Sequence, residues 1–419
     1  MVAGKGLRVN DAILKDRAWR RQFLLYAAAA CLLGLAGGIY EPTLNNFLVD
    51  VFHITAKERG ALEFPRELPG FLVTIFAGAL FFLREVRMAA LAAFIVSLGL
   101  WGICFQGHHY SLMLVSLVVW SAGAHLFMPV GDTIALALAG GKQAGTLLGR
   151  IGGYSTFAVI VGCLFVWLGR QYLHLSYAAV FATAASAALL GCGVLLGMKP
   201  IATVRHSRPK LVFRRRYWLY YVLCVLFGAR KQIFITFGPL VLILIFKQPA
   251  QTIAKLMIAA SVLGIVFKPA LGWMIDNLGE RFVLMADSVM LVGVCLGYGL
   301  ARTYLPAPYA LYLVYGCYVL DMMLFAMEMA RSTYMDKIAL SREDVGPTLT
   351  LGISINHAVS MSIPALGGIV WQLYGFGWVF VGAAVVAVIT LVMASRIRVP
   401  KGVSPARDEI EMEVAEEKF

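Results

Sequence analysis

The chain has 419 residues, of which 60% are hydrophobic and 14% are charged, and its formal net charge is +13. Soluble domains are nearer half apolar and a quarter charged, so this composition excludes an ordinary soluble enzyme and indicates a membrane protein. Most of the 36 Lys and Arg residues stand before the first hydrophobic run, in alternate links and after the last run. The positive charge therefore predicts the orientation of membrane helices, and we expect no nucleic-acid partner.

Residues 1–21 are basic and precede a long hydrophobic run. The pattern resembles the start of a signal peptide, but the run is too long and lacks a small-x-small cleavage site. We therefore expect a retained first span, with both termini on the cytoplasmic side of the plasma (inner) membrane.

Hydrophobic runs of about 20 residues, the length of helix that crosses a ~30 Å hydrocarbon core, recur along the chain. The links between them cannot form the wall of a barrel, so the sequence predicts an all-α polytopic protein embedded in the lipid bilayer. The twelve expected spans are 22–51, 59–83, 88–106, 111–138, 146–168, 173–197, 217–246, 251–275, 282–301, 308–330, 346–372 and 376–395.

A basic segment separates six spans from six and is expected to lie along the anionic cytoplasmic leaflet. When the sequences of the two halves are aligned with each other, Pro42 matches Pro239 and Thr55 matches Thr252. Each match is weak, but in two halves of like orientation they favour an internal duplication. The expected organisation is a basic cytoplasmic N-terminus (1–21), a six-helix bundle (22–197), a basic cytoplasmic linker (198–216), a second six-helix bundle (217–397) and an acidic cytoplasmic tail (398–419).

The link after the eighth span, GWMIDNLGER, has the pattern G-x-x-x-D-x-x-G-x-R, formed by Gly272, Asp276, Gly279 and Arg281. This pattern resembles the signature loop of the major facilitator superfamily. The corresponding link of the first half, GALFFLREVR, keeps Gly78 and Arg87 but has Phe82 in place of the aspartate. With the span count and the basic central link, the resemblance covers about residues 20–397.

The resemblance implies a secondary transporter with two pseudo-symmetric six-helix bundles and alternating access. A small-molecule substrate would bind near mid-membrane, spans 1, 4, 7 and 10 would line the cavity, and the signature loop would take part in gating. We expect a monomer.

Charged residues inside membrane spans are functional candidates by default. Arg230 and Lys231 lie about 13 residues into span 7, near the bilayer middle at ~1.5 Å per residue. Asp321 is comparably deep in span 10. Adjacent residues point about 100° apart on a helix, so only one of the basic pair faces the cavity. Two roles remain open for the pair: binding of an anionic substrate, or an ion pair with Asp321 or Glu328.

A second group of charges stands at the outer end of the first two spans. Glu63, Arg66 and Glu67 share one helical face, so Arg66 can neutralise at least one carboxylate. The surplus carboxylate, and Glu41 in span 1, are candidates for carrying a coupling proton. A purely structural role for the group, beside two helix-bending prolines, is the alternative.

Neutral side chains complete the candidate site. Tyr154 in span 5 can wall a cavity, and Asn356 in span 11 can form hydrogen bonds within the membrane. His125 and His357 are interpreted as packing residues. The sequence has no phosphate-loop, metal-cluster or nucleophile motif, so we expect no enzyme activity, cofactor or metal.

The sequence thus favours a proton-coupled transporter of a small organic anion or zwitterion, with Arg230 or Lys231, and also Arg66, contacting the substrate. Two other functions fit the same residues. One is a proton-coupled efflux antiporter for amphipathic or cationic compounds, with Glu41 and Asp321 as cation ligands. The other is a receptor or scaffold on a transporter fold, with every intramembrane charge paired.

Overall fold

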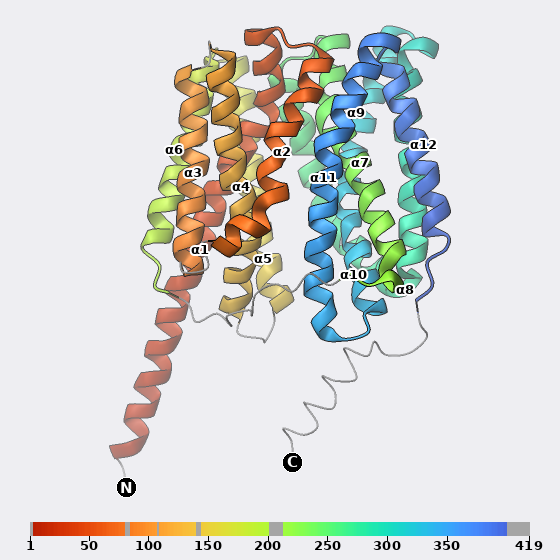
Figure 1. The fold of residues 1–419 in the computed structure, drawn as a ribbon. Coiled ribbons are helices and arrows are strands. Elements are labelled where there is room, and N and C mark those ends of the chain that lie inside the picture. Colours follow the sequence, from red (N-terminus) through yellow and green to blue (C-terminus); the bar gives the residue numbers. More distant parts are fainter. Residues whose placement is uncertain (1–2, 80–83, 107–108, 140–143, 201–212, 400–419) are drawn as a thin grey trace. The chain divides into compact units, whose positions relative to one another are not determined.

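The computed structural model describes residues 3–79, 84–106, 109–139, 144–200 and 213–399. The described residues form helices joined by short links, with no strand among them (Figure 1). The elements are α1 (Ala3–Phe52), α2 (Ala56–Ala79), α3 (Glu85–Gln106), α4 (Tyr110–Ala139), α5 (Ala144–Gln171), α6 (Tyr177–Leu196), η1 (Arg215–Tyr217), α7 (Trp218–Leu240), η2 (Val241–Ile245), α8 (Ala250–Tyr304), α9 (Ala307–Leu324), η3 (Phe325–Met327), α10 (Glu328–Ile338), α11 (Arg342–Tyr374) and α12 (Phe376–Ala394).

The prediction of twelve membrane helices is confirmed. Ten helices among the described residues are long and apolar enough to cross a membrane. The α8 helix counts twice, because Gly279 within it has φ 83° and ψ 159° and separates two helical arms. A positive φ favours glycine, which explains this position of the signature loop. The remaining helix is α2, a continuous helix that contains Pro65 and Pro69.

Packing divides the chain into two compact units, the first comprising residues 1–44 and 75–206 and the second comprising 45–74 and 207–419. Residues 45–74 thus pack with the C-terminal half, although they belong to the N-terminal half of the sequence. Gly60 allows this packing because it has no side chain. A Cβ at this position of α2 would lie 2.1 Å from the carbonyl oxygen of Pro364, so the backbone of α2 packs directly on α11. Phe82 and most of the linker and tail lie outside the described residues.

Small residues bring two helices of the first unit together. A Cβ on Gly38 of α1 would lie 2.3 Å from the carbonyl oxygen of Val159 in α5, so the two backbones meet at this point. Close approach of this kind is typical of membrane helices, which associate largely through van der Waals packing.

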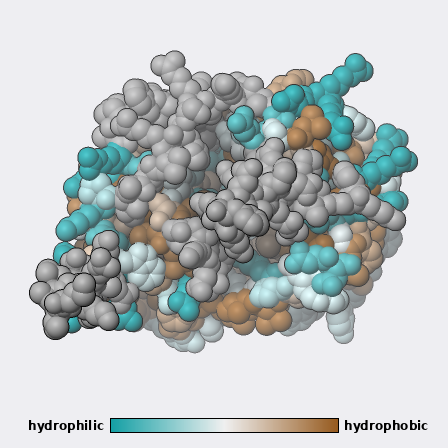
Figure 2. Space-filling model, turned by 90° about the horizontal axis from the view of Figure 1, so that it is seen from below, coloured by the Kyte–Doolittle hydropathy of each residue, from teal (hydrophilic) through white to brown (hydrophobic). Residues whose placement is uncertain are grey.

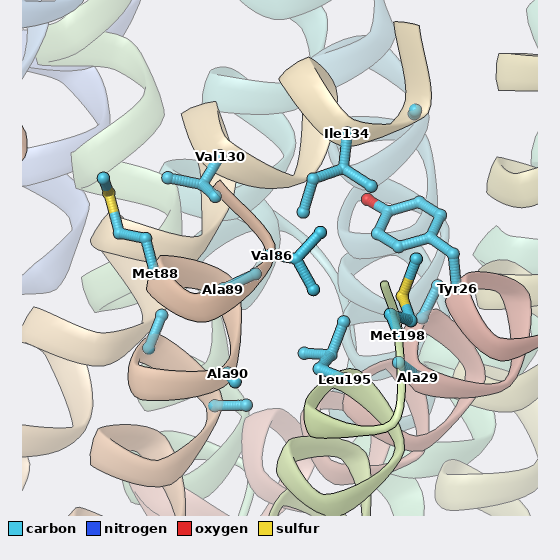
Figure 3. Packing of buried hydrophobic residues seen from close by; sticks show 14 of the residues in the cluster. Tyr26, Ala29, Val86, Met88, Ala89, Ala90, Val130, Ile134, Leu195 and Met198 are labelled. Carbon is cyan, nitrogen blue, oxygen red and sulfur yellow. The ribbon is translucent and has the colours of Figure 1, made fainter. Parts of the chain in front are cut away.

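An apolar cluster fills the interior of the same unit (Figure 3). Val86, Val130 and Ile134 belong to it together with Tyr26. The Tyr26 hydroxyl donates a 2.6 Å hydrogen bond to the carbonyl of Gly131, so its polar atom is satisfied within the cluster.

The second unit contains α7 packed against α11, and α8 packed against α9 and α12. At the end where α7 and α11 begin, Asp344 is held by Nε of Arg214 at 2.7 Å and by the Tyr217 hydroxyl at 2.8 Å. Lys337 of α10 pairs at 2.6 Å with buried Glu280 of the signature loop. Figure 2 looks onto this end of the helices and shows hydrophilic side chains beside hydrophobic ones.

The contact of α1 with α5 gives a first prediction. Gly38→Ala should destabilise the protein by about 1–3 kcal/mol, because the added methyl group overpacks against the backbone of α5. The matched control is Gly37→Ala, since a Cβ there meets nothing within 4 Å. Thermal unfolding in detergent measures both variants, and equal melting temperatures would contradict the packing described.

Candidate functional site

One face of α2 carries four charged residues, Arg59, Glu63, Arg66 and Glu67, at helical spacing. All four are buried, and Glu63 is 0% exposed. Burial is costly for an isolated charge, so each of these side chains requires partners.

Glu63 receives donors from two helices. Arg59 forms an ion pair with its Oε1, while Nε of Arg66 lies 2.7 Å from its Oε2. Gln232 of α7 donates from Nε2 to the same Oε2 at 2.7 Å. Arg59 also donates from Nε to Oδ1 of Asn45 at 2.7 Å. These contacts join α2 to α7.

Glu67 continues the network toward α11. Its Oε1 lies 2.7 Å from Nη2 of Arg66, and its Oε2 lies 2.9 Å from Nδ1 of His357. When Glu67 is ionised, its carboxylate only accepts hydrogen bonds, so Nδ1 of His357 is then the donor. We call the whole set the Glu63 network: Asn45, Arg59, Glu63, Arg66, Glu67, Gln232 and His357.

Sequence reasoning misses three members of this network. It interprets His357 as a packing residue and gives neither Arg59 nor Gln232 a role. The i, i+4 spacing of Arg59 and Glu63 is a usable signal for Arg59. Nothing local in the sequence indicates that Gln232 and His357, on helices distant along the chain, contact the carboxylates of α2.

A second charged region lies within the C-terminal helices. Nη2 of Arg230 is 3.1 Å from Oδ1 of Asp321, and the two side chains are 4% and 7% exposed. Arg331 of α10 pairs with Glu328 at 2.6 Å. The guanidinium of Arg331 also lies 3.9 Å from the ring centroid of Phe227, close enough for a cation–π contact.

Lys231 differs from its neighbour Arg230. Its side chain is partly exposed, and it forms no ion pair or hydrogen bond within the part of the chain that the structure describes. Four charged groups act on it, two of each sign: Glu67, Glu328, Arg66 and Arg331. Each of these four has a partner of opposite sign. When Lys231 is protonated, it therefore adds a positive charge that none of these four groups matches.

Two predicted residues lie in the first unit. Glu41 is exposed on α1, between the buried residues Tyr40 and Pro42. Tyr154 is 46% exposed on α5. Both side chains are thus accessible on helices that are otherwise largely apolar.

The other predicted residues lie in the second unit. Asn356 is buried against α7, because a Cβ on Gly228 would lie 2.8 Å from its carbonyl oxygen. In the signature loop Asp276 and Arg281 are exposed, while Gly272 and Gly279 are partly buried.

Comparison with known proteins identifies the architecture. The model of the Major Facilitator Superfamily matches residues 26–341. No curated protein sequence matches the chain. The fold resembles the crystal structure of a point mutant of the nucleoside transporter NupG, with a TM-score of 0.76, 15% identity and coverage of 90% of this chain and 99% of that one.

Two further solved structures share the fold. A D-xylose-proton symporter has a TM-score of 0.63, 15% identity and coverage of 91% of this chain and 98% of that one. The Major Facilitator Superfamily transporter FucP, in the outward conformation, has a TM-score of 0.60, 15% identity and coverage of 91% of this chain and 100% of that one. At this identity the likeness shows the fold alone.

The Glu63 network gives a second prediction. Glu63→Gln should lower the free energy of unfolding by about 3–5 kcal/mol, because it leaves two buried arginines short of a carboxylate. The control is Glu58→Gln, in the first turn of the same helix and ahead of the expected span. Hydrogen bonds from the backbone N–H and the hydroxyl of Thr55 lower the pKa of the exposed Glu58 carboxyl.

Glu58→Gln should lower the free energy of unfolding far less than Glu63→Gln does. Glu58 is exposed, so water solvates the groups that its replacement leaves unpaired. Chemical denaturation of the detergent-solubilised protein compares the two variants. A Glu63→Gln variant as stable as Glu58→Gln would show that the network does not hold α2 in place.

Proposed function

The chain belongs to the Major Facilitator Superfamily of membrane transporters, and we propose that it carries a small organic anion or zwitterion by alternating access, coupled to protons. The observation that supports the substrate class is Lys231, which forms no ion pair or hydrogen bond among the described residues. At ~1.5 Å per residue, Lys231 lies about 20 Å along α7 from its start, deep in the membrane. A charge at that depth requires a partner, and an anionic group of the substrate would supply it.

The neighbouring cations are less available to a substrate. Arg230 is paired with Asp321, and Arg66 is shared between Glu63 and Glu67. We therefore narrow the substrate-binding candidates to Lys231, with Arg230 and Arg66 in supporting roles. A lysine acts as a compact point charge, so it suits a carboxylate or a phosphate without demanding bidentate geometry.

The Glu63 network supports alternating access. It holds residues 45–74 on α7 and α11, near the turn between α1 and α2, which we expect on the outer side of the membrane. If α2 leaves α7 and α11 when the outer side opens, these buried contacts break and reform in each cycle. Protonation of Glu67 would weaken its pairs with Arg66 and His357 and so favour opening. Glu41 is the second candidate for carrying the coupling proton.

The alternatives fit the side-chain contacts less well. An efflux antiporter for cationic compounds would use Asp321 as a cation ligand, but Arg230 already occupies that carboxylate. A receptor or scaffold would have every intramembrane charge paired, whereas Lys231 is not paired among the described residues.

We also propose that the protein is a monomer in the plasma (inner) membrane with both termini in the cytoplasm. The orientation is supported by the basic residues concentrated in alternate links.

A ligand screen tests the substrate class. A panel of small carboxylates, phosphates and amino acids is tested for thermal stabilisation of the purified protein. At a ligand concentration of 100 times Kd, binding stabilises by about 2.7 kcal/mol. Lys231→Gln should weaken binding of the active compound about ten- to a hundredfold, since a charge-assisted hydrogen bond contributes about 1.5–3 kcal/mol.

The matched control for that screen is Lys268→Gln, on an exposed position of α8. It should bind the compound as the unmodified protein does. If no anion or zwitterion stabilises the protein, or if the stabilisation survives Lys231→Gln, the substrate class proposed here is wrong.

A further inference from the structure

A small cavity of about 20 Å³ in the second unit is lined by residues of α7, α8, η3, α10 and α12. Its polar lining is Arg230, Asp287, Arg331 and Thr390, and the rest is apolar. A polar cavity holds a water molecule once it offers about 10–15 Å³. The cavity is thus large enough for about one water.

Two of the lining residues carry buried atoms without a hydrogen-bond partner among the described residues. They are Nε and Nη1 of Arg230 and Oδ1 of Asp287. Arg230 is 4% exposed and Asp287 is 5% exposed. Two free donors and one free acceptor therefore border the same cavity, although no hydrogen bond joins them.

The charged groups around Asp287 lie on α7, α9 and α10, whereas η3 and the described residues of α12 carry no charge. Arg230 on α7 is paired with Asp321 on α9, and Arg331 on α10 is paired with Glu328. Both arginines are thus already matched by carboxylates. Asp287, if ionised, would add an unmatched negative charge in the buried interior of the protein, which is costly.

We propose that Asp287 is a proton-binding site, with a water in the cavity bridging its carboxyl group to the free nitrogens of Arg230. In the protonated state the carboxyl group of Asp287 is neutral and Arg230 forms an ion pair with Asp321 alone. When the proton leaves, the new carboxylate attracts the free Nε and Nη1, and Arg230 is shared between Asp287 and Asp321.

The site connects to the substrate through the chain itself. Arg230 and Lys231 are consecutive on α7, so the proton site acts on the same helix that carries the proposed substrate cation. The exposed carboxylate of Glu328, paired with the cavity-lining Arg331, offers the proton a polar route. The inference rests on the proton-coupled transport proposed above and adds Asp287 to Glu67 and Glu41 as a carrier of the coupling proton.

The experiment uses the purified full-length protein and the proton alone as the probe. Infrared difference spectra between acid and alkaline buffer report the carbonyl band of a buried carboxylic acid. We expect such a band in the unmodified protein and its loss in Asp287→Asn, which mimics the neutral acid and so should fold. Asp287→Glu should keep the band at a shifted frequency.

The matched control is Asp336→Asn, an exposed position of α10, which should leave the band unchanged. A band of undiminished intensity in Asp287→Asn would overturn the proposal, as would an absent band in the unmodified protein. Uptake of the screened compound into liposomes under a proton gradient is a separate readout. If a gradient drives no uptake while the Asp287 band is present, the site stands and the proton coupling of transport fails.

Discussion

A charge inside a membrane protein must be matched by a partner held at the correct distance, and the carboxylate of Glu63 shows what this constraint imposes on the helices. It is fully buried and accepts from Arg59, Arg66 and Gln232. Those donors come from α2 and α7, so satisfying the charge also holds one helix against the other. Residues 45–74 pack with the C-terminal half because of this pairing and because Gly60 lets the backbone of α2 approach the backbone of α11.

Local sequence patterns predicted much of the fold. The hydrophobic runs predicted twelve helices, and the glycine of the signature loop coincides with the positive φ that divides α8. The shared face of Glu63, Arg66 and Glu67 predicted that the arginine would neutralise a carboxylate of its own helix, and Arg66 contacts both. In each case the relevant residues lie within a few positions of one another, where helical geometry alone determines their neighbours.

The parts that could not be predicted involve residues far apart in the chain. The spacing of Glu67 and His357 carries no information about their 2.9 Å contact, which depends on how α2 packs on α11. The adjacent basic residues of α7 are an intermediate case. Helical geometry predicted that Arg230 and Lys231 point in different directions, but only the tertiary structure shows that Arg230 meets Asp321 while Lys231 has no such partner among the described residues.

Thiol labelling tests most directly whether Arg230 and Lys231 have the different environments described. Lys231→Cys and Arg230→Cys are each made in a background without the seven native cysteines, and a membrane-impermeant maleimide is added to the solubilised protein. The cysteine at position 231 should react quickly because that side chain is partly exposed, and the one at 230 slowly because that side chain is buried among the packed helices. Equal rates, or faster labelling at 230, would contradict the assignment of Lys231 as the substrate cation.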